Sequence, residues 1–505
     1  MRISGAKALK NIDRACVEEL GIPMMVLMEN AALKLFRHAE KIPGKYFVIA
    51  AGTGNNGGDA LALARHLTVS GRRAGVFITG DVDRGSQCFK ENYSIVRNMG
   101  LDIKIIKDAE GLRELKEELL KADAVVDGII GTGLNKEVKG IHREIIQLIN
   151  GVTPFTLCID IPSGMDCDTG RVLGCCIRGN MTVTFQHYKK GFLSCGSGEY
   201  IGEVIVESIG IPENIENKYG ENIFFTEGGY IRQNIKKRDK YSHKGSFGRT
   251  LIIGGSEGFY GAPEIASEAA VRCGSGLVTA AASKAVLEIL RLKLKEAMTA
   301  DTADERFEAL LGNAGGIGVG PGMGKGRESA ELLKKILNTA WCPVVIDADG
   351  LNILAAEPEL MEELRKRAAE GRHFIFTPHP GEMARLTGKT IDYINENRLE
   401  TAAEYAAENG IILLLKGFNT VITDGRTSYI NPTGNSAMAS GGMGDCLTGI
   451  IASLLSQGLG PLESSVCGAY IHGYAGERLS EKMHSLCASD INEYLPYALK
   501  EILSL

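Results

Sequence analysis

Apolar residues in the first half of the chain recur in two alternating patterns, one typical of helices and one of buried strands. Helical spacing predicts a helix over residues 1–40, which Pro43 and Gly44 end. Short apolar runs follow, separated by helical stretches, the first of which is expected to begin at Ala60. These runs predict strands at residues 46–51, 74–79, 103–106, 124–127 and 155–160. Such alternation is typical of a parallel sheet with helices on both faces.

A polar segment separates this pattern from a second one. Residues 211–245 are rich in lysine and asparagine and weakly periodic, which is typical of a domain boundary. We therefore expect an α/β protein of two domains, residues 1–215 and 225–505, with ligands at the carboxyl ends of the strands. In the second domain, strands are predicted at residues 249–254, 316–320, 343–347, 374–377 and 411–415.

Composition narrows the class of protein. Of the 505 residues, 44% are hydrophobic and 23% are charged, as in ordinary globular domains, so a disordered chain is excluded. The net charge of −6 disfavours nucleic acid as a partner, and no apolar run is long enough to cross a membrane. The N-terminus does not resemble a secretory signal, and the 12 cysteines have no paired or zinc-site spacing. We expect a cytoplasmic protein with buried, reduced thiols.

Glycine is unusually abundant, with 63 residues, and three of them form a motif after the first predicted strand. Gly52, Gly54 and Gly57 fit the GxGxxG pattern, in which backbone N–H groups at a helix start hold a diphosphate. With Asp81 as a ribose-binding acid, this pattern favours a nicotinamide-dependent dehydrogenase. The alternative is that the glycines serve only a tight turn.

Oxygen-bearing side chains gather in the loops after the predicted strands of the first domain. Asp127 and Asp160 end two strands, Ser163 follows in a turn, and Asn56 lies within the glycine motif. Such hard oxygen ligands suit an alkali or alkaline-earth ion, although singly each residue is a common turn former or helix cap. Asp59, also in the motif, either meets a cation or substrate hydroxyl or caps the following helix.

The second domain carries a GxGD motif at residues 442–445, ahead of a helix expected from Cys446. Stacked glycines before a helix direct backbone N–H groups at one point, which suits a transferring phosphoryl group. Asp445 is then placed to take a proton from a substrate hydroxyl. The alternative is that Asp445 only caps the helix.

Longer motifs in the first domain resemble the N-terminal domain of the bifunctional NAD(P)H-hydrate repair enzymes. They are GTGNNGGD, VVDGIIGTGL and CIDIPSGMDCDTG, within roughly residues 1–210. The resemblance implies an epimerase for the hydrated nicotinamide, with a potassium ion held by Asn56, Asp127 and Ser163. It implies that Asp160 contacts the altered ring, which makes Asp160 the candidate for proton transfer and Asp59 the alternative. The implied substrate-binding residues are Asn55, Asn56, Gly57, Gly58, Asp59, Gly131, Thr132, Gly133, Leu134, Asn135, Lys136, Glu137 and Asp160.

Five segments of the second domain resemble the ribokinase-like NAD(P)H-hydrate dehydratase domain over roughly residues 225–500. They are GGSEGFYGAP, GPGMG, TPHPGE, KGFNT and GNSAMASGGMGD, in this order along the chain. The residues implied to contact the hydrate are Ala262, Gly322, His379 and Asp445. Those implied to contact the adenine nucleotide are Lys416, Gly417, Phe418, Asn419, Thr420 and Gly444. Magnesium is expected with the nucleotide phosphates.

Two of these residues have structural alternatives. His379 stands between two prolines, so it is either a substrate contact or a turn residue. Lys416 either neutralises phosphate or is a solvated strand end.

The resemblance implies a repair enzyme for hydrated NADH and NADPH, in which one domain interconverts the R and S hydrates and the other dehydrates the S form. Asp445 would let the hydrate oxygen attack the terminal phosphoryl group, preferably of ADP, and phosphate would then depart in place of hydroxide. The alternatives are a small-molecule kinase with a regulatory first domain and a scaffold that only binds nucleotide-like ligands. A homo-oligomer is expected, although the sequence does not give the number of subunits.

Overall fold

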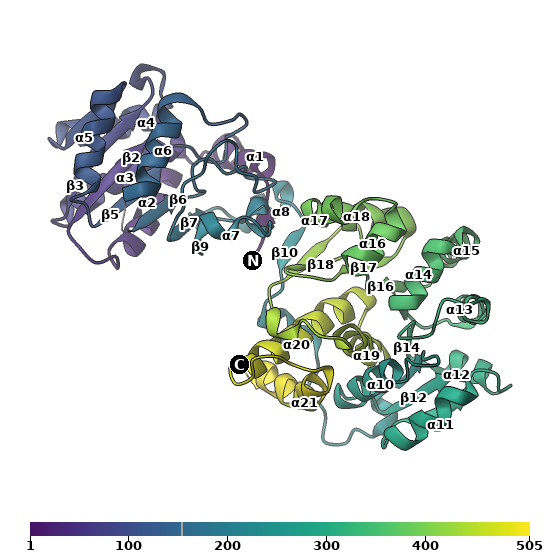
Figure 1. The fold of residues 1–505 in the computed structure, drawn as a ribbon. Helices are drawn as coiled ribbons and strands as arrows, with labels where there is room; N and C mark the ends of the chain where they lie inside the picture. The colour runs from purple at the N-terminus through teal and green to yellow at the C-terminus, as the bar shows by residue number, and fades with distance from the viewer. Residues whose placement is uncertain (153–154, 505) are drawn as a thin grey trace. The chain divides into compact units, whose positions relative to one another are not determined.

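The computed structural model describes residues 1–152 and 155–504, which form two compact units that divide between Asn222 and Ile223. Each unit contains one large sheet with helices packed against it (Figure 1). The predicted α/β class with two domains is confirmed. Within the described ranges, no helix is both long enough and apolar enough to cross a membrane.

The large sheet of the first unit is entirely parallel, with the strand order β4-β3-β2-β5-β6-β7-β9. The chain runs outward from β2 to β4 and then returns to β5, which pairs with the other side of β2. Ligands of open parallel sheets bind at the carboxyl ends of the strands where the order reverses in this way. The strands are β2 (Tyr46–Ala51), β3 (Arg73–Thr79), β4 (Asp102–Ile106), β5 (Ala124–Gly128), β6 (Thr156–Ile159), β7 (Met181–Phe185) and β9 (Glu203–Glu207), with a separate pair β1 (Ile3–Ser4) and β8 (Tyr188–Lys189).

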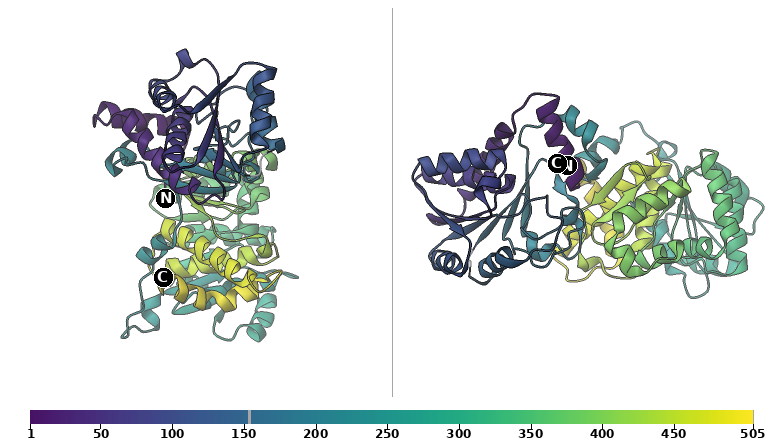
Figure 2. Two further views of the ribbon diagram at one scale, coloured as in Figure 1. Left: turned by 90° about the vertical axis from the view of Figure 1, so that its left-hand side faces the viewer. Right: turned by 90° about the horizontal axis from the view of Figure 1, so that it is seen from above.

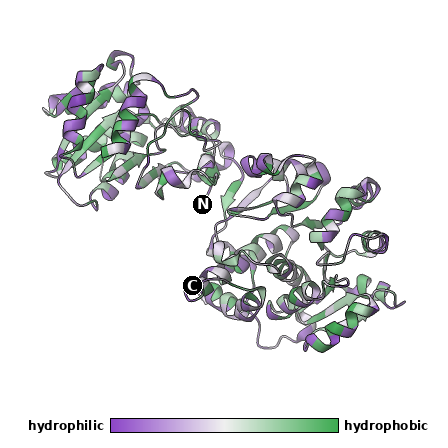
Figure 3. Cartoon of the chain, viewed as in Figure 1, coloured by the Kyte–Doolittle hydropathy of each residue, from purple (hydrophilic) through white to green (hydrophobic). Residues whose placement is uncertain are grey.

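Alternate side chains of the central strands face two separate apolar layers. Phe47 and Ile49 of β2 pack with α1 to α4, whereas Val48 and Ala50 pack with α5 and α6. Figure 3 shows the strands as predominantly hydrophobic ribbons, while the helices also carry hydrophilic residues. The helices of this unit are α1 (Ala6–Glu18), α2 (Met24–Ala39), α3 (Asn55–Val69), α4 (Gln87–Asn98), α5 (Ala109–Leu119), α6 (Gly140–Val152), α7 (Gly198–Ile201) and α8 (Glu213–Tyr219).

Two helix predictions for this unit are wrong. Residues 1–40 form two helices rather than one, because Gly21 has a left-handed φ of 68° and Pro23 sits at the N-cap of α2. The next helix, α3, begins at Asn55 rather than at Ala60, so residues 55–59 are already helical. Adjacent glycines are unfavourable in a helix, which is why the sequence pattern places these residues in a loop.

The sheet of the second unit has the order β10-β19-β18-β17-β16-β15-β14-β11-β12-β13. All pairs are parallel except β17–β18 and β18–β19, which are antiparallel. The unpredicted hairpin β18–β19 has a local signal, since Asp424-Gly425 lies between its strands and Gly425 has a φ of 85°. The strands are β10 (Ile223–Phe225), β11 (Arg249–Ile253), β12 (Leu277–Ala282), β13 (Met298–Asp301), β14 (Gly316–Val319), β15 (Val344–Ile346), β16 (Phe374–Phe376), β17 (Ile412–Leu415), β18 (Thr420–Thr423) and β19 (Ser428–Asn431).

Helices α10, α19 and α20 pack through apolar side chains against this sheet, and α21 packs against α10 and α20. Figure 2 gives two further views of these layers. The helices are α9 (Gly228–Asn234), α10 (Gly261–Arg272), α11 (Lys284–Lys293), α12 (Phe307–Asn313), α13 (Arg327–Thr339), α14 (Ala348–Ala356), α15 (Pro358–Ala369), α16 (Pro380–Thr387), α17 (Ile391–Glu396), α18 (Arg398–Asn409), α19 (Met443–Ser456), α20 (Pro461–Ser480) and α21 (Ala488–Ser504).

The cysteines are free thiols, but they are not all buried as predicted. Cys195 and Cys487 are exposed, and Cys175 and Cys342 are partly exposed. The polar segment 211–245 is also less irregular than its composition suggests, because α8, β10 and α9 lie within it.

Candidate active sites

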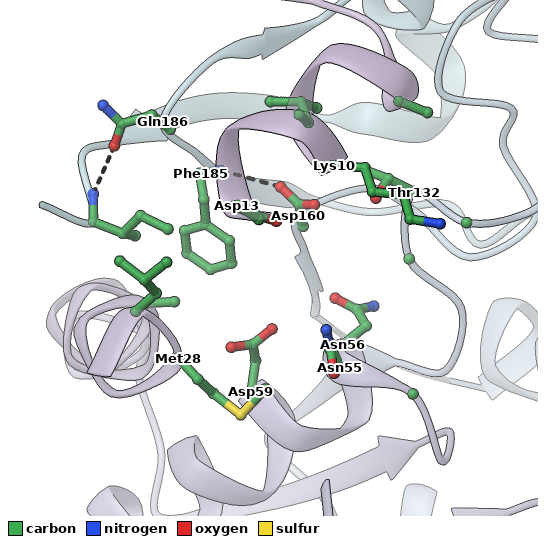
Figure 4. A pocket seen from close by; sticks show the side chains of 18 of the residues that line it. Lys10, Asp13, Met28, Asn55, Asn56, Asp59, Thr132, Asp160, Phe185 and Gln186 are labelled. Atoms are coloured by element: carbon green, nitrogen blue, oxygen red, sulfur yellow. Dashed lines mark hydrogen bonds between the residues drawn. The ribbon is translucent and has the colours of Figure 1, made fainter. Parts of the chain in front are cut away.

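A cavity of about 690 Å³ lies at the carboxyl ends of the central strands of the first unit, where the strand order reverses. The loops after β2, β5 and β6 contribute to its wall, together with helices α1, α2 and α3 (Figure 4). The predicted substrate residues that line it are Asn55, Asn56, Asp59, Gly131, Thr132, Gly133 and Asp160. The other predicted residues, Gly57, Gly58, Leu134, Asn135, Lys136 and Glu137, lie outside this lining.

Asp160 is held in place by a buried lysine that the sequence analysis did not identify. Nζ of Lys189 lies 2.7 Å from Oδ1 of Asp160, and the lysine side chain is only 1% exposed. Lys189 also donates hydrogen bonds to the carbonyl oxygens of Phe185 and His187. Asp160 has a left-handed φ of 63°, which is uncommon for a residue other than glycine. The hydroxyl of Thr184 and the backbone N–H of Phe185 donate to the same Oδ1, so Oδ2 remains available to the cavity.

Two further carboxyl groups face the same cavity. Burial raises the pKa of Asp59 well above its ordinary value, and the charges of Asp160 and Asp13 raise it further. Burial and the charge of Asp160 raise the pKa of Asp13 to about 6, although Lys189 opposes the shift. The interpretation of Asp59 as a helix cap is wrong, because Gly54 occupies the N-cap of α3 and Asp59 lies in the second turn. Neither Asp13 nor Lys189 was predicted, because no local motif marks them: Asp13 is one polar residue of α1, and Lys189 lies in the short strand β8, which was not predicted.

The three glycines of the GxGxxG motif have different roles. A Cβ at Gly57 would lie 1.8 Å from the carbonyl oxygen of Gly52, and a Cβ at Gly52 would lie 2.0 Å from that of Ile129. These two glycines therefore allow close backbone packing, whereas Gly54 borders open space and lines the cavity. Asp81 is exposed, accepts a hydrogen bond from the backbone of Asp83, and lies outside the cavity lining.

A cluster of buried polar side chains, Asn56, Asp127 and Ser163, adjoins the cavity, and Asn56 also lines it. The hydroxyl of Ser163 donates to Oδ1 of Asp127 at 2.5 Å, and the backbone N–H of Ser163 donates to Oδ2 at 2.8 Å. Burial raises the pKa of Asp127 to about 6, although the hydrogen bonds from Ser163 and Ile129 oppose the shift. Nδ2 of Asn56 is buried without a hydrogen-bond partner. The carboxylate of Asp127, the hydroxyl of Ser163 and the amide oxygen of Asn56 are hard oxygen donors, of the kind that suits an alkali or alkaline-earth ion.

The second unit contains a buried ion pair at the carboxyl ends of β15 and β17. Nζ of Lys416 lies 2.8 Å from Oδ1 of Asp347 and 3.9 Å from Oε2 of Glu382. Burial opposes the charged ammonium, but the two carboxylates outweigh it and raise the pKa of Lys416. Thr448 of α19 donates to the other oxygen of Asp347 at 2.9 Å. Lys416 is therefore not a solvated strand end. Asp347 ends a predicted strand, a signal that could have identified it.

Asp445 lies beside this ion pair, in the first turn of α19. The helix begins at Met443 rather than at Cys446, and Gly442, with a φ of 89°, is its N-cap, so the interpretation of Asp445 as a cap is wrong. Burial and the charge of Asp347 raise the pKa of Asp445 to about 7, against the effect of Lys416. A group with this pKa can exchange a proton at neutral pH.

A second cavity, of about 480 Å³, adjoins Lys416 and the start of α19. All the predicted nucleotide residues line it, namely Lys416, Gly417, Phe418, Asn419, Thr420 and Gly444. The predicted hydrate residues lie outside this lining. Ala262 and Gly322 are neighbours, since a Cβ at Gly322 would lie 3.2 Å from that of Ala262. His379 caps α16, because its Nδ1 accepts from the backbone N–H of Gly381 at 3.0 Å. No group of three or more His, Cys, Asp or Glu residues among residues 1–152 and 155–504 is arranged to hold a metal ion.

Comparison with known proteins matches the two units to different family models. The model described as YjeF-related protein N-terminus matches residues 24–191, and the model described as NAD(P)H-hydrate dehydratase matches residues 250–497. A solved structure of the ADP/ATP-dependent NAD(P)H-hydrate dehydratase from Bacillus subtilis, co-crystallised with ATP and Mg²⁺, is 31% identical to this chain. It covers 56% of this chain and 99% of its own, with a TM-score of 0.49.

Full-length relatives contain both parts in one chain. A bifunctional NAD(P)H-hydrate repair enzyme of Moorella thermoacetica is 37% identical over 99% of this chain and 97% of its own length. That of Thermofilum pendens is 34% identical over the same shares of the two chains. These matches do not favour a small-molecule kinase with a regulatory domain. Because the identity extends across both units, the chain belongs to the bifunctional NAD(P)H-hydrate repair enzymes.

Proposed function

We propose that the first unit interconverts the R and S forms of hydrated NADH and NADPH, and that the second unit dehydrates the S form with ADP as co-substrate. The observation that carries this proposal is the 37% identity to a bifunctional repair enzyme over nearly the whole chain. One cavity in each unit supports it, because a lysine that forms an ion pair with an aspartate lines each of these two cavities: Lys189 with Asp160 and Lys416 with Asp347.

In the first unit, Asp160 is the group that transfers a proton at the carbon next to the ring nitrogen. Its support is its place in the cavity lining and the ion pair with Lys189, which orients the carboxylate through Oδ1. Asn55, Asn56 and the loop that starts at Gly131 line the same cavity and bind the substrate there. Residues 134–137, Gly57 and Gly58 stay predicted substrate-binding residues, although they do not line the cavity.

The same unit holds a potassium ion through Asn56, Asp127 and Ser163. The support is the buried set of oxygen donors from Asp127 and Ser163. Nδ2 of Asn56 has no hydrogen-bond partner, and rotation of this amide by 180° puts its oxygen in the place of that nitrogen. Potassium supplies a positive charge behind the substrate loops. Since Gly131 lies against Asn56, this charge also positions the loop that binds the substrate.

In the second unit, Asp445 accepts the proton of the hydrate hydroxyl as its oxygen attacks the terminal phosphoryl group of ADP. The backbone N–H groups at the start of α19 bind the phosphoryl oxygens, and Lys416 balances their charge. Phosphate then leaves, assisted by the lone pair of the ring nitrogen. Ala262, Gly322 and His379 contact the hydrate. Magnesium, bound with the nucleotide, neutralises phosphate charge.

ADP is preferred to ATP in this proposal because the fused arrangement of the chain resembles the bacterial form, and no residue selects between them. We also propose a cytoplasmic location, which the free state of the described cysteines supports. A homo-oligomer stays a prediction.

The test uses the full chain with a mixture of R and S hydrates, ADP and Mg²⁺, and follows the recovery of dihydronicotinamide absorbance. Asp445→Ala should abolish recovery. Asp160→Ala should leave rapid recovery of the S fraction and slow the remainder. A stable phosphorylated alcohol, formed from ATP and a candidate alcohol, would instead support the kinase alternative. An isolated fragment of residues 1–220 that does not epimerise would support the scaffold alternative.

A further inference from the structure

The cavity of the first unit is lined by more carboxyl groups than the proposed reaction has used. Asp13 comes from α1, Asp59 from α3 and Asp160 from the loop after β6, and all three line the same space. The lysine in direct contact, Lys189, pairs with Asp160 alone. Three carboxylates in one confined space repel one another, and this repulsion favours the protonated form of a group that has no ionic partner.

The geometry separates these groups into two sets. In Figure 4, Asp13 and Asp160 lie together on one side of the cavity, and Asp59 approaches from the other side with its carboxyl group directed inward. Asp160 has a cationic partner at 2.7 Å, whereas Asp59 is partly buried and has no ion pair with any described residue. Asp160 is therefore the carboxyl group with an ionic partner, and Asp59 is the group most easily kept neutral.

We propose that Asp59 is a second acid–base residue of the epimerase site, which carries a proton while Asp160 is ionised, so that the two act on opposite faces of the hydrated ring. This inference rests on the proposed epimerase function. It assigns to Asp59 a proton-transfer role of its own, in addition to that of Asp160.

Inversion at the carbon next to the ring nitrogen requires oxygen to leave from one face and to return on the other. Asp59 gives its proton to the hydroxyl, the C–O bond breaks with its electron pair on oxygen, and the nitrogen lone pair forms a C=N bond. One water molecule and a cationic ring result. Water then adds to the opposite face, the C=N electrons return to nitrogen, and Asp160 takes the released proton. The reverse reaction exchanges the two roles, and solvent returns the proton.

The charges around Asp59 offer a way to change its pKa without a change to Asp59 itself. Asp160, Asp13 and Cys88 interact electrostatically with Asp59, and the lysines that line the same cavity are Lys189, Lys7 and Lys10. Of these, Asp13 shares the cavity and raises the pKa of Asp59 through its charge. Removal of the Asp13 charge should therefore shift the pH at which Asp59 loses its proton, without removal of the proton donor.

The experiment measures epimerisation of the R hydrate by the full chain, with the wild type first. Asp59→Asn keeps the size of the side chain but cannot release the proton, so epimerisation should fall by about 100-fold or more. Dehydration of the S hydrate by the other unit should be unchanged, which shows that the chain is folded. The matched control is Asp81→Asn, the same change at an exposed carboxylate outside the cavity, which should leave both reactions unchanged.

A pH profile distinguishes proton transfer from a structural role. Epimerisation by the wild type should fall at high pH as Asp59 ionises, and Asp13→Asn should move this fall to lower pH. If Asp59→Asn loses dehydration as well, Asp59→Ala with added formate is measured, and recovery of epimerisation supports the proposal. Wild-type epimerisation by Asp59→Asn, no recovery with formate, or an unmoved profile in Asp13→Asn overturns it. A wild type that does not epimerise contradicts the proposed function itself.

Discussion

Nζ of Lys416, at the carboxyl end of β17, lies 2.8 Å from Oδ1 of Asp347, whose side chain is 2% exposed. A Cβ at Gly444 would lie 3.2 Å from the same Nζ, so the start of α19 packs directly onto this ion pair. The pair thus joins the carboxyl end of the sheet to the glycine-rich helix start. It is a structural contact, and it places the ammonium group of Lys416 at the adjoining cavity.

Loss of this lysine should destabilise the second unit. Lys416→Met leaves Asp347 buried without a cation, which typically costs about 3–5 kcal/mol. Chemical unfolding of the full chain measures the loss. The double variant Lys416→Met/Asp347→Asn should recover most of the stability but not the dehydration of the S hydrate. A single variant as stable as the wild type would contradict the burial argument.

The rate of dehydration should depend on the protonation of Asp445. Its pKa is raised to about 7, and the base form exists above that value, so the rate should rise with pH through about 7. Asp349 is a like charge that raises this pKa, and Asp349→Asn should therefore move the rise to lower pH. The profile of S-hydrate dehydration checks the prediction, and a flat profile in the wild type would count against Asp445 as the base.

Potassium should be required by the first unit only. Replacement of K⁺ by choline should reduce epimerisation, and return of K⁺ should restore it, while dehydration continues in both buffers. Ser163→Ala removes one proposed ligand and the hydrogen bond to Asp127, so the K⁺ concentration for half-maximal epimerisation should rise. Epimerisation at full rate without K⁺ would show that the oxygen cluster has another role.

Two glycines of one motif should respond differently to the same substitution. Gly57→Ala forces a Cβ to 1.8 Å from the carbonyl oxygen of Gly52, so the unit should lose about 1–3 kcal/mol or more of stability. Gly54→Ala introduces a Cβ into open space and should leave stability unchanged while it narrows the cavity. Chemical unfolding compares the pair. Equal losses would mean that Gly57 is not needed for close packing.

The sequence by itself determined the alternation of strands and helices and the positions of the glycine motifs. Apolar periodicity predicts the strand β2 with the bounds that the structure has, because a fully buried strand leaves a continuous apolar run. Since the carboxyl ends of parallel strands meet at one edge, the pattern also indicated that Asp127 and Asp160 lie near a common site. The starts of helices were predicted less accurately. The glycines in the first turns of α3 allow close backbone packing, but their low helix propensity makes this segment resemble a loop.

Only the tertiary structure decided which charges meet. No sequence pattern indicates that Lys189 and Asp160 form an ion pair. Asp13, from helix α1, lines the same cavity. Lys416 and Asp347 come from different strand ends. Burial and the approach of elements distant along the chain determine whether a carboxyl group is paired, neutral or a helix cap. The spacing of residues along the chain indicates local periodicity. It does not give the distances between side chains that are far apart in the sequence, and these distances determine which carboxyl groups are paired.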